Sequence, residues 1–150
     1  MKVLTAIPLL LVVIVVYNFL AFGLLAFGHA DSGNAAADAL AVVVFSVKMV
    51  SGEFWKVTVS DLILVFSLLF LFIEIIRATN IRTVAVTNNA LSMFVFVLAL
   101  IEFLIVKGFS TSTFFLITVM TLIDTIAGFI IGMISARRDI GLDPTGLRGV

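Results

Sequence analysis

The fold class follows from the stretch Phe114–Ser135, FFLITVMTLIDTIAGFIIGMIS, which has the composition of a lipid-soluble helix. About 20 apolar residues in a helix are enough to cross the roughly 30 Å hydrocarbon core of a bilayer. One carboxylate, Asp124, interrupts the stretch close to its middle. Because a carboxylate at that depth costs about 2.5–3.5 kcal/mol, we expect Asp124 to face protein or water rather than lipid.

The composition of the whole chain also indicates that lipid solvates it. Of the 150 residues, 63% are apolar and 12% are charged, and the mean hydropathy is +1.33. Soluble domains average about 45–50% apolar residues. The sequence therefore predicts an all-α membrane protein, a single integral membrane domain over 1–150, with four transmembrane helices at about 3–27, 61–78, 88–106 and 113–136.

The run at 3–27 has a second interpretation, a cleaved signal peptide. Lys2 precedes the run, and the small residues of Gly28–Ala30 follow it. However, the apolar region of a signal peptide usually has only about 7–15 residues. We therefore expect an uncleaved helix, with Pro8 in the first turns, where a missing backbone amide costs least.

Basic residues near the helix ends predict the orientation, because loops on the cytoplasmic side are enriched in Lys and Arg. If the N-terminus is inside, the inner set is Lys2, Arg77, Arg82, Arg137, Arg138 and Arg148, and the outer set is Lys48, Lys56 and Lys107. This distribution predicts that both termini are cytoplasmic. It places the loop 28–60 outside and makes 137–150 a short cytoplasmic tail.

The outer loop contains a hairpin pattern at about 44–59. Phe45–Met49 and Trp55–Val59 alternate with period two around the turn residues Ser51 and Gly52. A hairpin of only two strands is marginally stable in water, so we expect its apolar face to pack over the bundle or on the lipid interface. Trp55 is the expected anchor at the level of the lipid headgroups.

The register of the hairpin can be predicted from its two faces. A three-residue loop, Ser51–Glu53, pairs Met49 with Trp55 and Val47 with Val57, which gathers apolar pairs on one face. It also places Lys48 opposite Lys56 on the other face. A two-residue loop would shift the register by one residue and mix the two faces, so the longer loop is preferred.

Polar residues within the four runs are few, and they are the candidates for an intramembrane site. They are Asn18, Ser67, Glu74, Ser92, Glu102, Thr118, Thr121, Asp124 and Thr125. A rise of about 1.5 Å per residue along a helix gives the depth of each of these residues below the outer boundary of the membrane. The depths predict these partners: Asn18 with Asp124, Thr118 or a neighbour with Glu102, and Ser92 or Asn88 with Glu74. Arg77, one turn beyond Glu74, is a further candidate partner of Glu74.

The same residues lie on stripes with helical spacing. In the last helix the stripe is Thr121, Thr125, Gly128, Gly132 and Ser135, and in the third it is Asn88, Ser92, Val95, Ala99 and Glu102. In the second helix, Ser67 and Glu74 are one heptad apart. Small residues spaced in this way permit close approach of two helices, so we expect a helix-packing seam that faces a shared interior.

Several functions are excluded by what the sequence lacks. There is no cysteine and only one histidine, His29, and neither a phosphate loop nor a zinc motif is present. No basic cluster is dense enough to indicate nucleic-acid binding. We therefore expect no enzymatic activity, no catalytic residues, no cofactor and no metal.

Several short sequence segments resemble those of a known family. They are Ser51-Gly52 with Trp55 and Asp61-Leu62, Phe72-Ile73-Glu74 with Ala78-Thr79, Ser112–Leu116, Asp124, Gly128, and Ala136–Asp139. Over about residues 45–140 the chain resembles an uncharacterised family of short four-helix inner-membrane proteins of proteobacteria. The resemblance implies a multi-pass location in the bacterial inner membrane with a periplasmic hairpin. It transfers no activity.

Two functions are compatible with these features. The first is a non-enzymatic accessory, assembly or structural subunit, whose partners are the lipid bilayer and a homo-oligomer or larger membrane complex. The alternative is a small oligomeric transporter of protons, ions or solutes that uses Asp124 and Glu102. Small multidrug transporters have the same size but an acidic residue in the first helix, and 3–27 has none. A polar, water-sized passage linking Glu102, Asp124 and Glu74 would favour the transporter. An Asp124 that is hydrogen-bonded and shielded from water would favour the structural subunit.

Overall fold

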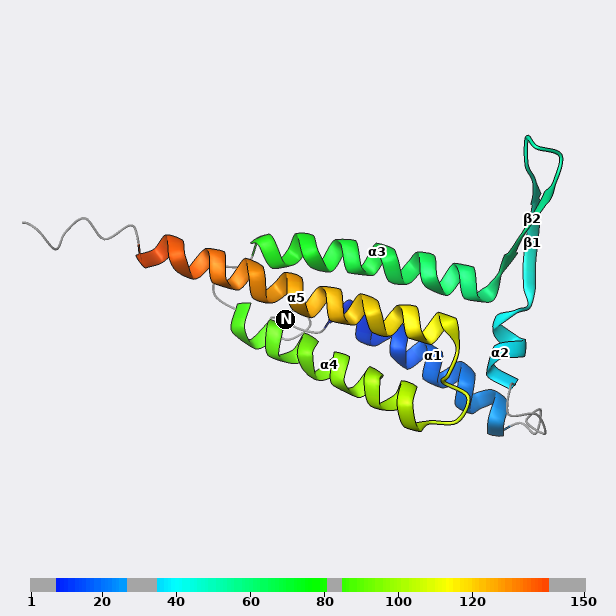
Figure 1. Cartoon of the computed structure of the whole chain (residues 1–150), viewed down its shortest axis with the longest axis horizontal. Helices are drawn as coiled ribbons and strands as arrows, with labels where there is room; N and C mark the ends of the chain where they lie inside the picture. Colours follow the sequence, from blue (N-terminus) through cyan, green and yellow to red (C-terminus); the bar gives the residue numbers. More distant parts are fainter. Residues whose placement is uncertain (1–7, 27–34, 81–84, 141–150) are drawn as a thin grey trace, which may run out of the picture.

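The computed structural model describes residues 8–26, 35–80 and 85–140, and it is mostly helical (Figure 1). Its elements are α1 (Leu9–Ala26), α2 (Ala35–Leu40), β1 (Val43–Lys48), β2 (Phe54–Thr58), α3 (Val59–Asn80), α4 (Ala85–Ile105) and α5 (Ser112–Ile140). The four predicted helices and the hairpin are all present. Residues 3–7 and 27 of the first predicted span lie outside the described residues, as does most of the predicted tail.

The four long helices lie side by side, and α2 and the hairpin are at one end of the bundle (Figure 1). Helix α5 is central, because it contacts α1, α3 and α4. Helix α1 also packs against α3 and α2. The end that carries α2 and the hairpin is the end predicted to be outside.

Two segments of the described chain are long and apolar enough to cross a membrane. They are Val59–Thr79 and Ser112–Ile134. The apolar parts of α1 and α4, Leu9–Gly23 and Asn89–Ile105, are shorter. Large apolar side chains are exposed on all four helices, such as Phe19, Phe72, Phe94 and Phe129. Surfaces of this kind suit lipid contact, because a soluble protein seldom exposes large contiguous apolar patches.

An aromatic cluster closes the bundle next to α2. The Tyr17 ring of α1 packs against Phe109 and Phe114, with ring centroids 5.4 and 4.7 Å apart. The Tyr17 hydroxyl hydrogen-bonds to the hydroxyl of Thr111, which in turn accepts the backbone N–H of Phe114 at 3.2 Å. Thr111 is therefore the N-cap of α5, and Tyr17 fixes that cap from another helix.

Helix α3 begins directly after β2 at a capping box. The Asp61 carboxylate accepts hydrogen bonds from the backbone N–H of Thr58 at 2.8 Å and from its hydroxyl at 2.7 Å. The backbone N–H of Asp61 donates back to the Thr58 hydroxyl oxygen at 3.4 Å. The two residues thus satisfy polar groups that a helix start leaves without partners.

The hairpin has a different register from the predicted one. Val47 pairs with Trp55 and Lys48 with Phe54, and the three-residue loop is Val50–Gly52 rather than Ser51–Glu53. Gly52 explains the shift, since its φ of 90° is the left-handed conformation needed at the last position of such a loop. The predicted pairing of Lys48 with Lys56 is therefore wrong.

The two faces of the hairpin nevertheless keep their predicted character, because the shift in pairing is by two residues. One face carries Phe45, Val47, Trp55 and Val57, and the other carries Ser46, Lys48, Phe54 and Lys56. The residues of the two faces would exchange places only if the strand pairing shifted by an odd number of residues. The hairpin is therefore amphipathic, apart from Phe54 on its polar face.

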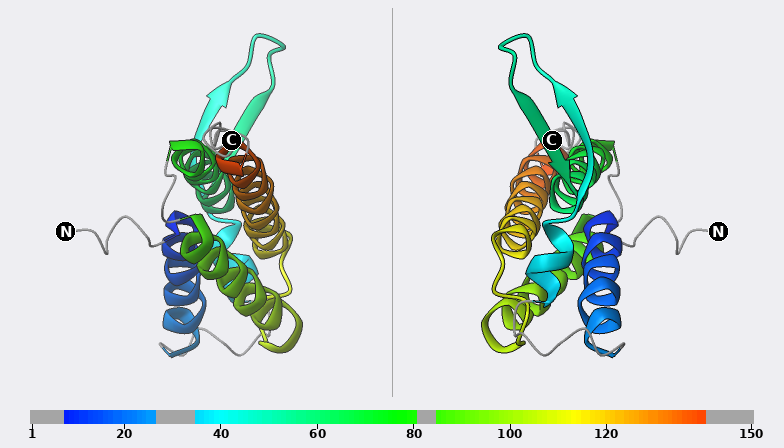
Figure 2. Two further views of the ribbon diagram at one scale, coloured as in Figure 1. Left: turned by 90° about the vertical axis from the view of Figure 1, so that its left-hand side faces the viewer. Right: turned by 90° about the vertical axis from the view of Figure 1, so that its right-hand side faces the viewer.

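The hairpin does not pack over the bundle, so this predicted placement is wrong, while the placement on the lipid interface stays a prediction. It extends sideways from the end of the bundle, across the direction of the helix axes (Figures 1 and 2). All strand residues except Val57 and Thr58 are exposed, and Trp55 is 54% exposed. The strands are held at their base instead, where Val57 is buried and the capping box joins β2 to α3.

Candidate functional site

The predicted intramembrane polar residues do face the interior of the bundle. Seven of them are buried: Ser67, Glu74, Ser92, Thr118, Thr121, Asp124 and Thr125. Asn18 and Glu102 are half-buried. The helical spacing of these residues therefore identified the inner faces correctly, and the individual partners remain to be compared with the prediction.

Glu74 of α3 is held by the first turn of α1. Its two carboxylate oxygens accept the backbone N–H groups of Leu9 at 3.1 Å and of Leu10 at 3.4 Å. The first amides of a helix have no partner within the helix and carry a partial positive charge. Glu74, which is only 3% exposed, therefore caps α1 from a neighbouring helix. Arg77, the predicted partner, adds a favourable electrostatic interaction.

Asp124 of α5 is bound by Ser92 of α4. The Ser92 hydroxyl is a hydrogen-bond partner of the Asp124 carboxylate, and Asp124 is 6% exposed. Asp124 also lies close enough to Glu74 for their negative charges to interact. Glu74, Ser92 and Asp124 thus form one polar cluster, the α1–α3–α4–α5 cluster, which includes the start of α1. The predicted bond from Ser92 to Glu74 is replaced by the bond from Ser92 to Asp124.

Asn18 binds Glu102, so the predicted pair of Asn18 and Asp124 is wrong. The Asn18 side-chain N–H₂ donates to Glu102 Oε2 at 3.0 Å and to the carbonyl of Ile14 at 3.0 Å. The depth estimate assumed that every helix runs straight from a common boundary. Helix α1 begins and ends farther toward the α2 end of the bundle than α4 does (Figure 1), so residues counted to different depths lie at the same level.

The threonines of α5 bond within their own helix. The hydroxyls of Thr118, Thr121 and Thr125 donate to the carbonyls of Phe114, Thr118 and Thr121 at 2.9, 2.7 and 2.9 Å. Bonds of this type satisfy a hydroxyl without any second helix. The prediction that Thr118 or a neighbour binds Glu102 is therefore wrong for Thr118. The hydroxyls of these small side chains are therefore already hydrogen-bonded, so the threonines provide a packing surface rather than groups that bind a ligand.

The helix-packing seam of α5 is filled by a residue that sequence reasoning missed, Asn89 of α4. Its side-chain N–H₂ donates to the carbonyl of Gly128 at 2.8 Å. A Cβ atom at Gly128 would overlap the Asn89 side chain, and one at Gly132 would lie 3.3 Å from its nitrogen. The signal was available, because Asn89 precedes Ser92 by three residues. The side chains of Asn88 and Ser135 lie outside the described residues.

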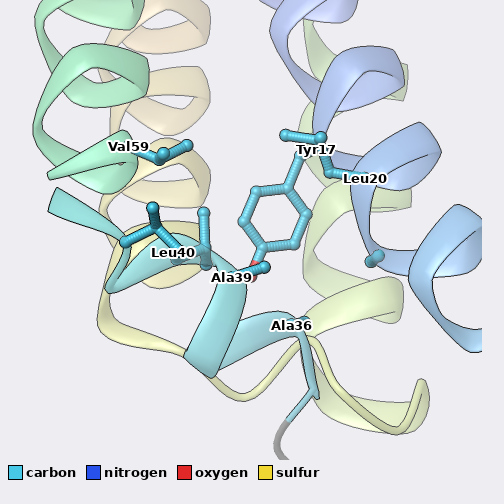
Figure 3. A pocket seen from close by; sticks show the side chains of 8 residues that line it. Tyr17, Leu20, Ala36, Ala39, Leu40 and Val59 are labelled. Atoms are coloured by element: carbon cyan, nitrogen blue, oxygen red, sulfur yellow. The ribbon is translucent and has the colours of Figure 1, made fainter. Parts of the chain in front are cut away.

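Described residues line two cavities, and one of the two includes polar groups of the site. One, of about 200 Å³, is apolar and lies between α1, α2 and the start of α3, where the Tyr17 ring points toward Ala39 and Leu40 (Figure 3). The other, of about 500 Å³, lies between α1 and α4 and is lined by Asn18 and Glu102 among apolar residues. Neither Glu74 nor Asp124 lines this second cavity.

The chemistry of these groups is that of hydrogen bonding between helices. No group of three metal-ligating side chains occurs within residues 8–26, 35–80 and 85–140. Each polar pair joins two different helices: Glu74 to α1, Ser92 to Asp124, Asn18 to Glu102 and Asn89 to Gly128. Comparisons with protein-family models, with curated proteins and with solved structures found no match to this chain.

Proposed function

We propose that the chain is a non-enzymatic, four-span protein of the bacterial inner membrane that serves as an accessory, assembly or structural subunit. Both termini are cytoplasmic in this proposal, and α2 and the hairpin lie on the periplasmic side. The exposed apolar side chains of α1 and α4 support four spans, although the apolar parts of these helices are shorter than those of α3 and α5.

The observation that carries the structural role is the use made of the buried polar groups. The carboxylate of Glu74 caps one helix, and that of Asp124 binds another, so neither is free to take a substrate. In a membrane, polar contacts of this kind hold helices together where lipid provides no hydrophobic drive. The α1–α3–α4–α5 cluster therefore holds these four helices together.

A transport role is the second candidate, and Glu102 is the observation that favours it. Its half-buried carboxylate lines the cavity between α1 and α4, whereas the carboxylates of Glu74 and Asp124 do not. An intramembrane carboxylate beside a cavity is a common element of ion and proton pathways. A transporter of this size would work as an oligomer, because four helices enclose little space.

Substitution of Asp124 separates the two functions. In proteoliposomes, we expect neither the wild-type chain nor Asp124→Asn to move protons or monovalent cations faster than empty vesicles. Asp124→Asn should keep a near-normal protein level because an amide oxygen still accepts from Ser92, whereas Asp124→Leu should lower it. Wild-type flux that Asp124→Asn abolishes at unchanged protein level would defeat the structural role.

Trp55 provides a test of where the hairpin lies, because it is the only tryptophan of the chain. We expect its fluorescence in vesicles to be quenched more by lipids brominated near the headgroup than by lipids brominated at the chain ends. Two variants made on Trp55→Phe serve as controls: Phe45→Trp on the same face should behave alike, and Lys56→Trp on the opposite face should be quenched less. Emission that only a water-soluble quencher reduces would contradict this placement.

A further inference from the structure

The cavity between α1 and α4 has the form of a groove along the bundle. Figure 2 shows α1 and α4 diverging, and these two helices pack against α3 and α5 rather than closely against each other. Seven residues between Leu11 and Gly23 of α1 line the groove, together with Val95, Leu98 and Glu102 of α4. All of them except Asn18, Gly23 and Glu102 carry apolar side chains.

Glu102 is the only charged residue in this lining. One of its oxygens accepts the Asn18 N–H₂ at 3.0 Å, and no other described residue bonds to the carboxylate. Asn18 therefore fixes the orientation of the carboxylate and leaves hydrogen-bonding capacity directed to the groove. A cationic donor would form the strongest bond there, because both partners would be charged.

The groove extends along α1 to both sides of Glu102. The span from Gly23 back to Leu11 corresponds to about 18 Å of helix, and half of the hydrocarbon core is about 15 Å thick. Glu102 lies three residues before the end of α4 at Ile105, which is about 4.5 Å along the helix. Glu102 also bonds to Asn18, from which the groove continues along α1 about 10 Å inward to Leu11 and about 7 Å outward to Gly23. The inward part has an apolar lining that can hold an acyl chain below an ammonium group bound to Glu102.

We propose that this groove binds an aminophospholipid of the outer leaflet, with an acyl chain between α1 and α4 and its primary ammonium group on Glu102. The inference rests on the proposed four-span arrangement. The charge of the lining argues for this occupant, because Glu102 is the one charged group in an otherwise largely apolar groove and an aminophospholipid supplies both an ammonium group and apolar chains.

Native mass spectrometry of the purified full-length chain tests the site. The protein is offered phosphatidylethanolamine, phosphatidylcholine and phosphatidylglycerol with identical acyl chains. We expect the first lipid retained to be phosphatidylethanolamine, with about a tenfold preference over phosphatidylglycerol, because only a primary amine donates a charged hydrogen bond. Glu102→Gln should reduce this preference to about twofold, while Glu53→Gln, at an exposed control carboxylate next to the hairpin loop, should leave it unchanged.

A second variant keeps the test valid if Glu102→Gln does not fold. Val15→Trp fills the groove from a half-exposed position and should abolish retention of all three lipids. Equal retention of the lipids by the wild type, or a preference that survives Glu102→Gln, would overturn the proposal. So would a wild-type dimer that Val15→Trp dissociates, because the groove would then hold a second copy. Release of the chain by alkaline carbonate would instead contradict the four spans, which separates the two failures.

Discussion

Gly128→Ala is expected to destabilise the bundle by about 1–3 kcal/mol, although alanine is normally the better helix residue. The added Cβ would overlap the Asn89 side chain, whose Cγ atom is 3.1 Å from the ideal Cβ position. Asn89 cannot simply turn away, because it would give up its 2.8 Å bond to the Gly128 carbonyl in a buried place. Unfolding of the purified chain by titration with a denaturing detergent measures the loss.

Two variants show whether the clash is the cause. Gly23→Ala is the matched control, since no atom lies within 4 Å of its ideal Cβ position, and it should stabilise α1 by about 0.5–1 kcal/mol. Asn89→Ala removes the obstacle at the cost of one hydrogen bond. In that background Gly128→Ala should cost little, so the two changes should be strongly non-additive. Additive losses would mean that Asn89 does not pack on Gly128.

The helices, the hairpin and the buried faces were predictable because each is a periodic property of the sequence. Apolar runs located α1, α3, α4 and α5, and the period-two alternation located β1 and β2. The helical spacing of Ser67 with Glu74, and of Ser92 with Ala99, identified faces that the structure buries. Such patterns depend only on neighbours in the same element, so no knowledge of tertiary contacts was required.

The partners were not predictable, because they depend on how the helices are placed along the bundle and on groups that no side-chain pattern reveals. Asn18 meets Glu102 rather than Asp124 because α1 is displaced along the bundle relative to α4 (Figure 1). Glu74 binds backbone amides of Leu9 and Leu10, which any residue type would provide. In the hairpin, the left-handed conformation of Gly52 fixes which three residues form the loop, and this shifts every cross-strand pair from the predicted register.

Glu74→Leu is expected to have the largest effect of any single substitution in the chain, a loss of roughly 2–5 kcal/mol. Leucine cannot accept a hydrogen bond, so the Leu9 and Leu10 amides would lose their partner at a buried helix start. Each unsatisfied buried donor costs about 1–3 kcal/mol, and the favourable charge at the start of α1 would be lost as well. Detergent titration should show the loss, and protein level in membranes should fall with it.

Glu74→Gln distinguishes capping from charge. A glutamine oxygen still accepts one of the two amides, and the substitution also removes the repulsion from Asp124. We therefore expect Glu74→Gln to cost less than half as much as Glu74→Leu. If the two variants lose equal stability, the negative charge and its attraction to Arg77 are what matter at this position. If neither loses stability, the start of α1 does not depend on Glu74, and the α1–α3–α4–α5 cluster is not the structural element that holds the first helix to the bundle.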